Sequence, residues 1–360
     1  MTDSSATHRC LILADANPQI GTGHVMRCAI LGRHLRERGI AVDYVVADTT
    51  AGMQAWIRRE GFGLHVLSHT QRDDAEQLHR YLQQLGSQRS LLLFDSDREA
   101  FYRADYQRKL RDYGLGLLMI TFHNAEAFYV HLLHNQNPLA LDTVYHCPLA
   151  TRQLLGLEYV ILKPAYEALY EASRTKSTAR ISTILLTFGG SDQWNLTATV
   201  LGLLDRLASP VPLRIIAVVG ALYRGLDALK KQVAASQHQA ELYVQTEEMP
   251  RLMYEADLAI TSGGLTVWEL ACCKTLNLVL PTSIREIRTA AKLKAEGLIY
   301  FEGSFRERAP EDLSAQIAQI LKRPPGDHQT MVDRFHQRIN PRGAQRVVGA
   351  IKNWLQNDTL

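Results

Sequence analysis

The chain has 360 residues, of which 46% are hydrophobic and 21% are charged. Lysine and arginine number 40 against 37 aspartate and glutamate residues, so the formal net charge is only +3. This charge is too small and too dispersed to predict binding to nucleic acid or to an anionic membrane surface, although a small anionic substrate stays compatible. The length accommodates two domains of roughly 150 to 180 residues each.

The cysteine pattern and the hydrophobic runs predict a cytoplasmic protein. Cys28, Cys272 and Cys273 fall in apolar helical patterns, and the total of five is odd, which is typical of reduced thiols. Residues 1–9 are polar and lack the apolar core of a signal peptide. No apolar run approaches the ~18 residues that span a bilayer, so we expect no integral membrane segment.

Short apolar runs alternate with longer segments of helical period along most of the chain, which predicts parallel sheets covered by helices. In the first half the expected strands are residues 10–15, 42–47, 64–67, 91–95 and 115–121. Amphipathic segments such as 26–38 and 71–85 separate them. Because open parallel sheets bind ligands at the carboxyl ends of their strands, each connection after a strand is a candidate site.

The strand pattern stops and then restarts in the second half. Residues 163–180 carry charged and small side chains, so we interpret them as a linker with a helical piece. The expected strands that follow are 181–187, 214–219, 242–244, 258–261 and 276–280.

The predicted fold class is therefore α/β, with two Rossmann-like parallel-sheet domains facing a cleft. We expect an N-terminal domain over residues 1–165 and a C-terminal domain over 178–342. A helical segment within 343–360 follows an Asn-Pro-Arg-Gly breaker, and we expect it to pack back on the N-terminal domain.

The first candidate site is the loop after the first expected strand, where Asp15 is followed by Gly21, Gly23 and His24. The glycines allow a ligand to approach the backbone, and the helix start offers free N–H groups. The loop lacks the third glycine of the dinucleotide fingerprint. The helix dipole should lower the pKa of His24 and favour the neutral imidazole, which can act as a general base. A histidine that only caps or packs the helix start explains the same pattern.

The second candidate site is TSGGLTVWEL, residues 261–270, where a strand breaks at two glycines and opens a helix. Free backbone N–H groups there can bind a diphosphate, and the carboxylate of Glu269 can accept hydrogen bonds from ribose hydroxyls. The expected nucleotide-binding residues are Ser262, Gly263, Gly264, Leu265, Thr266 and Glu269. The same pattern is also explained if no ligand binds there. In that case the helix dipole favours the charge of Glu269, and Trp268 is part of the core.

A third glycine turn, Gly189 and Gly190, ends the expected strand 181–187. Ser191 and Asp192 follow it and are explained as a helix cap without any ligand. We place Gly189 and Gly190 with the nucleotide-binding residues because they lie in the same half of the chain as the second site.

Other polar groups do not predict a metal or cofactor. FDSD, residues 94–97, matches the Asp-x-Asp metal-binding signature of one glycosyltransferase fold. The lack of further convergent carboxylates favours a strand end that binds no metal. Isolated histidines near strands are more often hydrogen-bonded polar residues than metal ligands, and this describes His123, His131 and His134. We therefore expect no zinc site, no other metal and no cofactor.

The motifs together resemble the hydrolases of pseudaminic acid biosynthesis, which cleave UDP-2,4-diacetamido-2,4,6-trideoxy-β-L-altropyranose to UDP and the free sugar. The resemblance begins at ADANPQIGTGHVMRCAILGRHLRERG, and the related spore coat polysaccharide proteins open with similar residues. It continues through GLEYVILKPAYEAL, LLTFGGSDQWNLT and EEMPRLMYEADLAITSGGLTVWELACCKTLNLVLP. The family has the two-domain GT-B architecture, similar to the lipid II-forming N-acetylglucosaminyltransferase.

The resemblance implies a metal-independent attack of water on the anomeric carbon, with inversion and release of UDP. The family's base matches His24, the aspartate of the same loop matches Asp15, and its UDP segment matches Gly263, Gly264, Leu265, Thr266 and Glu269. Three functions stay open: a hydrolase of a UDP-linked deoxyaminosugar in nonulosonic acid or surface polysaccharide biosynthesis, a GT-B glycosyltransferase, and a non-catalytic nucleotide-sugar-binding protein. The oligomeric state, monomer or dimer, is open too.

The chain departs from the family pattern mainly on the sugar side. Leu13 stands where an arginine is usual, and residues 282–291 lack the usual polar pair. FDSDREA and TFHNAEA stand where the family has Asp-x-Tyr and a later Asp-Asp. The expected nucleotide half is therefore better preserved than the sugar half.

Overall fold

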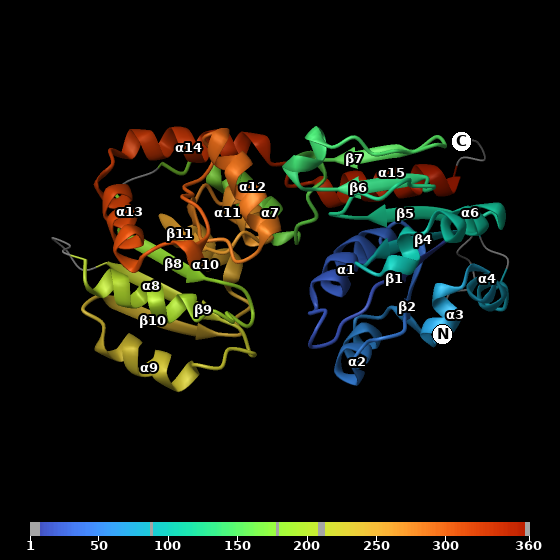
Figure 1. Cartoon of the computed structure of the whole chain (residues 1–360), viewed down its shortest axis with the longest axis horizontal. Helices are drawn as coiled ribbons and strands as arrows, with labels where there is room; N and C mark the ends of the chain where they lie inside the picture. The colour runs from blue at the N-terminus through green and yellow to red at the C-terminus, as the bar shows by residue number, and fades with distance from the viewer. Residues whose placement is uncertain (1–7, 87–88, 178–179, 208–212, 357–360) are drawn as a thin grey trace. The chain divides into compact units, whose positions relative to one another are not determined.

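The computed structural model describes residues 8–86, 89–177, 180–207 and 213–356. The chain divides into two compact units, which Figure 1 shows in outline. The first unit combines Met1–Leu162 with Arg342–Leu360, and the second is Lys163–Pro341. Residues 178–179 of the expected linker and 357–360 of the expected C-terminal segment lie outside the described residues.

The first unit contains a seven-stranded parallel sheet in the order β3-β2-β1-β4-β5-β6-β7. Its strands are β1 (His8–Leu13), β2 (Ala41–Val46), β3 (Gly63–Val66), β4 (Arg89–Asp95), β5 (Gly116–Ile120), β6 (Leu132–Asn135) and β7 (Arg152–Leu155). The five strands expected in this half are confirmed. The strands β6 and β7 were not expected, because each has only four residues and half of them are polar.

The helices of the first unit connect these strands. They are α1 (Gly23–Arg36), α2 (Ala51–Arg59), α3 (His69–Asp73), α4 (Ala75–Gln83), α5 (Glu99–Tyr102), α6 (Ala104–Asp112), the 3-10 turns η1 (Pro138–Asp142) and η2 (Leu157–Tyr159), and α15 (Gly343–Gln356). The single helix expected over 71–85 is two helices. It divides at Asp74, whose side chain accepts a hydrogen bond from the Gln77 N–H and so caps α4.

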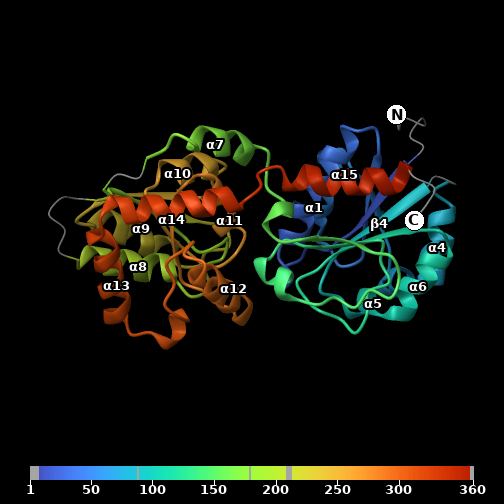
Figure 2. The same ribbon diagram turned by 90° about the horizontal axis from the view of Figure 1, so that it is seen from above.

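Each face of the first sheet has its own apolar core, because successive strand residues point to opposite faces. Cys10 and Ile12 of β1 pack with α1 and α15. Leu11 and Leu13 pack on the other side with residues of α4, α5 and α6. Figure 2 shows α1 and α15 on one side of this sheet and α5 and α6 on the other.

The C-terminal helix α15 packs against α1 within the first unit. Gly343 allows the start of α15 to lie against Val160, because a Cβ at residue 343 would lie 2.3 Å from the Val160 carbonyl oxygen. At the other end, a Cβ on Gly116 would lie 2.2 Å from the Trp354 ring. The Arg89 guanidinium lies over that ring, 4.6 Å from its centroid, and donates to the Trp354 carbonyl at 3.0 Å.

The second unit contains a five-stranded parallel sheet in the order β10-β9-β8-β11-β12. Its strands, all five of them expected, are β8 (Thr183–Thr187), β9 (Arg214–Val219), β10 (Gln239–Val244), β11 (Leu258–Thr261) and β12 (Leu276–Val279). Its helices are α7 (Ala165–Ser173), α8 (Leu196–Asp205), α9 (Leu226–Ala235), α10 (Met249–Glu255), α11 (Thr266–Cys272), α12 (Ile284–Ala295), η3 (Phe305–Glu307), α13 (Pro310–Lys322) and α14 (Pro325–Arg338).

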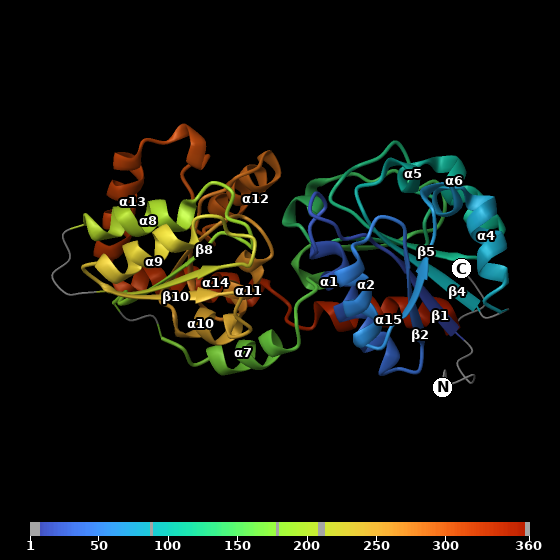
Figure 3. The same cartoon turned by 90° about the horizontal axis from the view of Figure 1, so that it is seen from below.

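The helices of the second unit cover both faces of its sheet. Figure 3 shows α8 and α9 on one side and α7 and α10 on the other. Ile184 and Leu186 of β8 pack with α8, α9 and α13 in one apolar core. Across the described ranges, no helix has the length and hydrophobicity needed to cross a membrane.

Replacing Trp354 by alanine should lower the free energy of unfolding by roughly 3 to 5 kcal/mol, because it leaves a cavity between α15 and β5. Urea denaturation measures this difference. Trp194→Ala, which removes a side chain that is 44% exposed, is the matched control and should cost less than about 1 kcal/mol. Equal losses in the two variants would contradict the assigned packing of α15.

Candidate functional site

The polar residues of the first unit gather where its parallel strands end. Asp15 follows β1, Asp95 is the last residue of β4, and His24 lies in the first turn of α1. Ligands of open parallel sheets bind at this carboxyl edge. The sheet topology therefore brings together residues that are 71 positions apart in the sequence, such as His24 and Asp95.

A tight turn sets the start of α1. The Asn17 Oδ1 accepts hydrogen bonds from the N–H groups of Gln19 and Ile20, and the Gly21 N–H donates to the Asn17 carbonyl at 2.8 Å. Gly21 has a φ of +79°, which a residue with a Cβ rarely adopts. A Cβ on Gly21 or Gly23 would meet nothing within 4 Å, so both glycines border open space.

The imidazole of His24 is held by the carboxylate of Asp95. The His24 Nδ1 lies 2.6 Å from the Asp95 Oδ1, and the Asp95 side chain is only 1% exposed. Arg27, one turn further along α1, donates from Nε to Oδ2 at 2.8 Å and from Nη2 to Oδ1 at 2.5 Å. The buried carboxylate is thus paired with a two-pronged guanidinium and an imidazole from one helix.

Asp95 reverses the expected effect of the helix dipole on His24. Burial lowers the pKa of His24, but the hydrogen bond and the charge of Asp95 outweigh burial and raise the pKa above its ordinary value. The expected lowering of the pKa is therefore wrong. The physical reason is the Asp95 carboxylate, which folding brings against the helix start and whose effect exceeds that of the backbone dipole.

The other ring nitrogen of His24 is available for proton transfer. Because Nδ1–H donates to Asp95, the unprotonated Nε2 is the atom that accepts a proton. Within the described parts of the chain no hydrogen bond engages Nε2, and the side chain is 20% exposed. The pair is thus a base whose orientation and tautomer are fixed by a buried acid.

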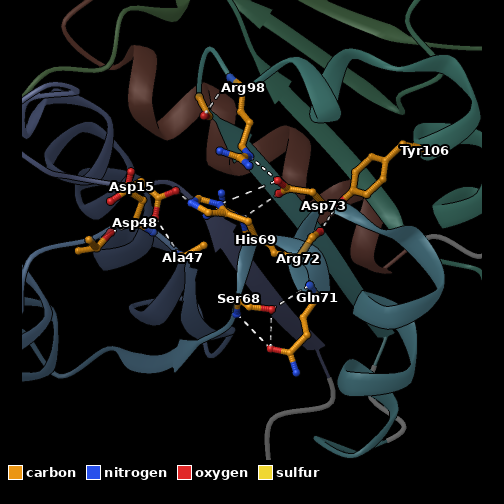
Figure 4. A network of polar contacts seen from close by, with 12 residues as sticks. Asp15, Ala47, Asp48, Ser68, His69, Gln71, Arg72, Asp73, Arg98 and Tyr106 are labelled. Carbon is orange, nitrogen blue, oxygen red and sulfur yellow. Dashed lines mark hydrogen bonds and ion pairs between the residues drawn. The ribbon is translucent and has the colours of Figure 1, made fainter.

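Asp15 has different partners, which Figure 4 shows. Its Oδ1 accepts from the N–H groups of Ala47 and Asp48, both at 2.9 Å, and from the Thr49 hydroxyl at 3.0 Å. Its Oδ2 accepts from the Arg72 Nη1 at 2.6 Å. Burial raises the pKa of Asp15, but Arg72 and the backbone N–H groups outweigh it and lower the pKa. Asp15 therefore connects the ends of β1 and β2 to Arg72 and makes no described contact with His24.

The network continues from Arg72 into the loops after β3 and β4. Arg72 is fully buried, and its carbonyl accepts a hydrogen bond from the Tyr106 hydroxyl at 2.8 Å. Asp73 pairs with both Arg72 and Arg98, and the Arg98 N–H donates to the Ser96 hydroxyl. Figure 4 shows these contacts as one continuous network at this edge. The network supports the loops that surround the candidate base.

Arg27 was not predicted as a site residue, and Asp95 was predicted only as a strand end. The spacing of His24 and Arg27 could have indicated a shared site, because residues three apart lie on the same face of a helix. Asp97, two residues after Asp95, pairs with His123 at 2.9 Å, and its charge also raises the pKa of His24. Among the described residues, no group of three or more histidine, cysteine or acidic side chains is placed to hold a metal ion.

In the second unit, the two glycines after β11 have different roles. A Cβ on Gly263 would lie 2.6 Å from the Cβ of Glu286, whereas one on Gly264 would meet nothing within 4 Å. Glu286 also accepts hydrogen bonds from the Thr282 N–H at 2.7 Å and hydroxyl at 3.0 Å. No hydrogen bond within the described residues engages the N–H of Gly264 or Leu265. These two groups are available for a ligand.

The glycine turn after β8 lies against the loop after β9. Gly189 has a φ of +81°, and a Cβ on Gly220 would lie 2.3 Å from the Gly190 carbonyl oxygen. The expected cap is confirmed for Asp192, which accepts from the N–H groups of Leu196 at 2.8 Å and Thr197 at 2.9 Å.

Glu269 is a partly buried carboxyl on α11. Burial raises its pKa to about 7, although the charge of Lys163 and the polar hydroxyl of Tyr166 lower it. Near neutral pH this group therefore exchanges between a carboxylic acid and a carboxylate.

His134 of the first unit was expected to be a hydrogen-bonded polar residue rather than a ligand. Its Nε2 donates to the Tyr159 carbonyl at 2.8 Å.

Replacing Asp95 by asparagine should lower the pKa of His24 below its ordinary value, because burial and the charge of Arg27 then outweigh the smaller effect of Asp97. An NMR titration of the His24 imidazole, with folding checked by circular dichroism, measures the shift. Asp105→Asn, which changes an exposed aspartate of α6, should leave the His24 pKa in place. An unchanged pKa in the Asp95 variant would show that Asp95 does not control His24.

Sequence comparison connects the chain to polysaccharide biosynthesis proteins. It is 25% identical over 317 residues to the spore coat polysaccharide biosynthesis protein SpsG of Bacillus subtilis, which covers 87% of this chain and 89% of SpsG. It is 24% identical over 268 residues to the uncharacterized protein MJ1062 of Methanocaldococcus jannaschii, with 72% of this chain and 52% of that protein covered. No protein-family model matches the chain.

Solved structures share the fold over nearly the whole chain. MurG of Acinetobacter baumannii has a TM-score of 0.71 at 18% identity and covers 96% of this chain and 99% of its own. Anabaena HepE in complex with UDP has a TM-score of 0.60 at 12% identity and covers 96% of this chain and 100% of its own. With its two parallel α/β sheets, the chain has the GT-B fold, and its sequence is similar to that of SpsG.

Proposed function

We propose that this protein hydrolyses a UDP-linked deoxyaminosugar at the anomeric carbon and releases UDP, in the biosynthesis of a nonulosonic acid or a surface polysaccharide. The observation that carries the proposal is the His24–Asp95 pair at the carboxyl edge of the first sheet. The relation to SpsG, whose name refers to polysaccharide biosynthesis, supports the pathway class. HepE, a protein of similar fold, is in complex with UDP, which supports the nucleotide.

In this proposal, His24 activates the nucleophile. Its Nε2 takes a proton from a water molecule as the water attacks the anomeric carbon from the face opposite UDP, which inverts the configuration. Asp95 holds the imidazole through Nδ1 and stabilises the imidazolium that forms. Arg27 keeps the pKa of Asp95 well below its usual range despite burial, so the carboxylate stays ionised throughout.

The leaving group is assigned to the second unit. The free N–H groups of Gly264 and Leu265 donate to the diphosphate, with Thr266 and the turn at Gly189 and Gly190 beside them in the proposed site. These dipoles stabilise the charge that develops on UDP as the glycosidic bond breaks. Glu269 accepts hydrogen bonds from the ribose hydroxyls.

In this scheme Asp15 has a supporting part rather than a chemical one. All the contacts of its carboxylate go to Arg72 and to the loop after β2. We propose that Asp15 maintains the shape of the sugar side of the site, while Asp95 acts on the base. Gly21 and Gly23, which border open space, allow the substrate to approach the start of α1.

The alternative function is transfer of the sugar to an acceptor. The similarity in fold to a glycosyltransferase of Rickettsia africae favours it. In that case His24 deprotonates an acceptor hydroxyl instead of water, and every proposed nucleotide contact stays the same.

Replacing His24 by alanine should reduce UDP release from UDP-linked deoxyaminosugars by ~10²–10⁴-fold, the contribution of a positioned base, with UDP affinity nearly unchanged. Chromatography of the nucleotide products and calorimetry with UDP measure the two quantities. His69→Ala is the control, because His69 belongs to the Asp73 network and not to the Asp95 pair.

Wild-type turnover is measured with and without glycan acceptors. UDP release that depends on an acceptor would identify a transferase and contradict hydrolysis. Stabilisation by UDP-sugars without any turnover would identify a binding protein. Full activity of the His24 variant would eliminate His24 as the base.

A further inference from the structure

A second histidine–aspartate pair lies at the carboxyl edge of the first sheet. The His123 Nε2 is 2.9 Å from the Asp97 Oδ1. Asp97 is the second residue after β4, and His123 is the third residue after β5. These strands are neighbours, with Asp95 in register with Ile120. The sheet therefore places the pair where ligands of open parallel sheets bind.

Contacts within the first unit connect this pair to the proposed base. Arg27, which binds Asp95, lies with its guanidinium carbon 4.9 Å from the centre of the Phe122 ring. Phe122 directly precedes His123 in the chain. Because Asp95 also binds His24, the contacts run without a break from the base to the loop that carries His123. The two histidine–aspartate pairs are therefore parts of one continuous arrangement.

Tyr102 of α5 holds together the loops that carry the second pair. Its hydroxyl donates to the Ser96 carbonyl at 3.2 Å and lies 3.1 Å from the Thr121 Oγ1. Thr121, which is buried, accepts a hydrogen bond from the His123 N–H at 2.9 Å. The Tyr102 ring meets the imidazole of His123 edge on, with 6.2 Å between the ring centres. The pair is therefore ordered before any ligand binds, which lowers the entropic cost of binding.

The second pair has polar atoms left for a ligand, because its side chains are 45% and 55% exposed. A carboxylate only accepts hydrogen bonds, so the shared proton is on the His123 Nε2. In the neutral imidazole Nδ1 is then an acceptor, as is the second oxygen of Asp97. Within the described residues no hydrogen bond engages either atom. The pair thus offers two neighbouring acceptors.

The charge of Asp97 is not compensated by an arginine, in contrast to that of Asp95. Arg98, the next residue, pairs instead with Asp73 at the end of α3. Among the described residues, Asp97 forms an ion pair with no lysine or arginine. Its carboxylate therefore favours a group that donates hydrogen bonds and disfavours a second anion.

We propose that Asp97 and His123 form a binding site for donor groups of the sugar, an acetamido N–H and a hydroxyl on adjacent ring carbons. The site thereby selects sugars that lack an acidic substituent. This inference rests on the proposed function, in which the sugar lies beside His24. The free oxygen of Asp97 accepts from one donor and the His123 Nδ1 from the other. His24 keeps the proton transfer, and the second pair binds and positions the sugar.

The test is calorimetry of the full chain in a His24→Ala background, in which the sugar nucleotide stays intact during the titration. The ligands are UDP and UDP-2,4-diacetamido-2,4,6-trideoxy-β-L-altropyranose. Asp97→Asn keeps an oxygen for His123 but presents an amide donor to the sugar. It should weaken binding of the sugar nucleotide at least about tenfold. UDP affinity should change less than about twofold, because UDP is assigned to the second unit.

Two further variants separate binding from general disruption. His123→Gln keeps a donor for Asp97 but lacks the Nδ1 acceptor, so it should weaken sugar-nucleotide binding about three- to tenfold. Asp105→Asn, on the exposed part of α6, is the matched control and should leave both affinities unchanged.

A second pair of ligands tests the selection against acids. With Asp97 present, UDP-glucuronic acid should bind at least about fivefold more weakly than UDP-N-acetylglucosamine. Asp97→Asn removes the charge and should reduce this ratio to less than about twofold. A structural role of Asp97 alone would not change the ratio.

Unchanged sugar-nucleotide affinity in the Asp97 and His123 variants, or a ratio that Asp97→Asn does not alter, would overturn the inference. UDP binding by the wild type would then leave the proposed function standing. Absence of UDP binding and of UDP release by the wild type would overturn the proposed function and this inference with it.

Discussion

The carboxylate of Asp95 organises the candidate site of the first unit, because a guanidinium and an imidazole from one helix converge on it. A carboxylate that is 1% exposed must be compensated, and Arg27 does so through both of its oxygens. A further hydrogen bond joins Asp95 to His24 and fixes its ring, and the Cys28 thiol donates weakly to Oδ2 at 3.5 Å. Structural and chemical roles are therefore inseparable here: without Asp95, Arg27 is left buried and unpaired and His24 loses its orientation.

The two buried acids at this edge have separate tasks, although β1 and β4 are neighbouring strands. Asp15 connects loops through backbone N–H groups and Arg72. Asp95 instead binds the side chains of His24 and Arg27, both on α1. In both cases an arginine lowers the pKa of the acid against the effect of burial. The proposed base thus depends on Asp95, and the shape of its surroundings depends on Asp15.

The strands were predictable because buried parallel strands are continuous apolar runs, as in residues 91–95 and 258–261. The strands β6 and β7 at one end of the first sheet were not, because their short segments mix polar and apolar residues. His24 and Glu269 were predictable as candidates from glycine turns at helix starts. The partner of His24, Asp95, was not, because this pairing crosses 71 positions of sequence and depends on sheet order. For the same reason the direction of the His24 pKa shift could not be read from the helix dipole alone.

The central claim is that His24 activates water for attack on the anomeric carbon. The most direct measurement is mass spectrometry of the products formed from UDP-linked deoxyaminosugars in water enriched in oxygen-18. The account predicts that the heavy oxygen appears in the free sugar and not in UDP. Heavy oxygen in UDP would indicate attack at phosphorus, and turnover that occurs only with a glycan acceptor would indicate transfer. Either result would contradict the account.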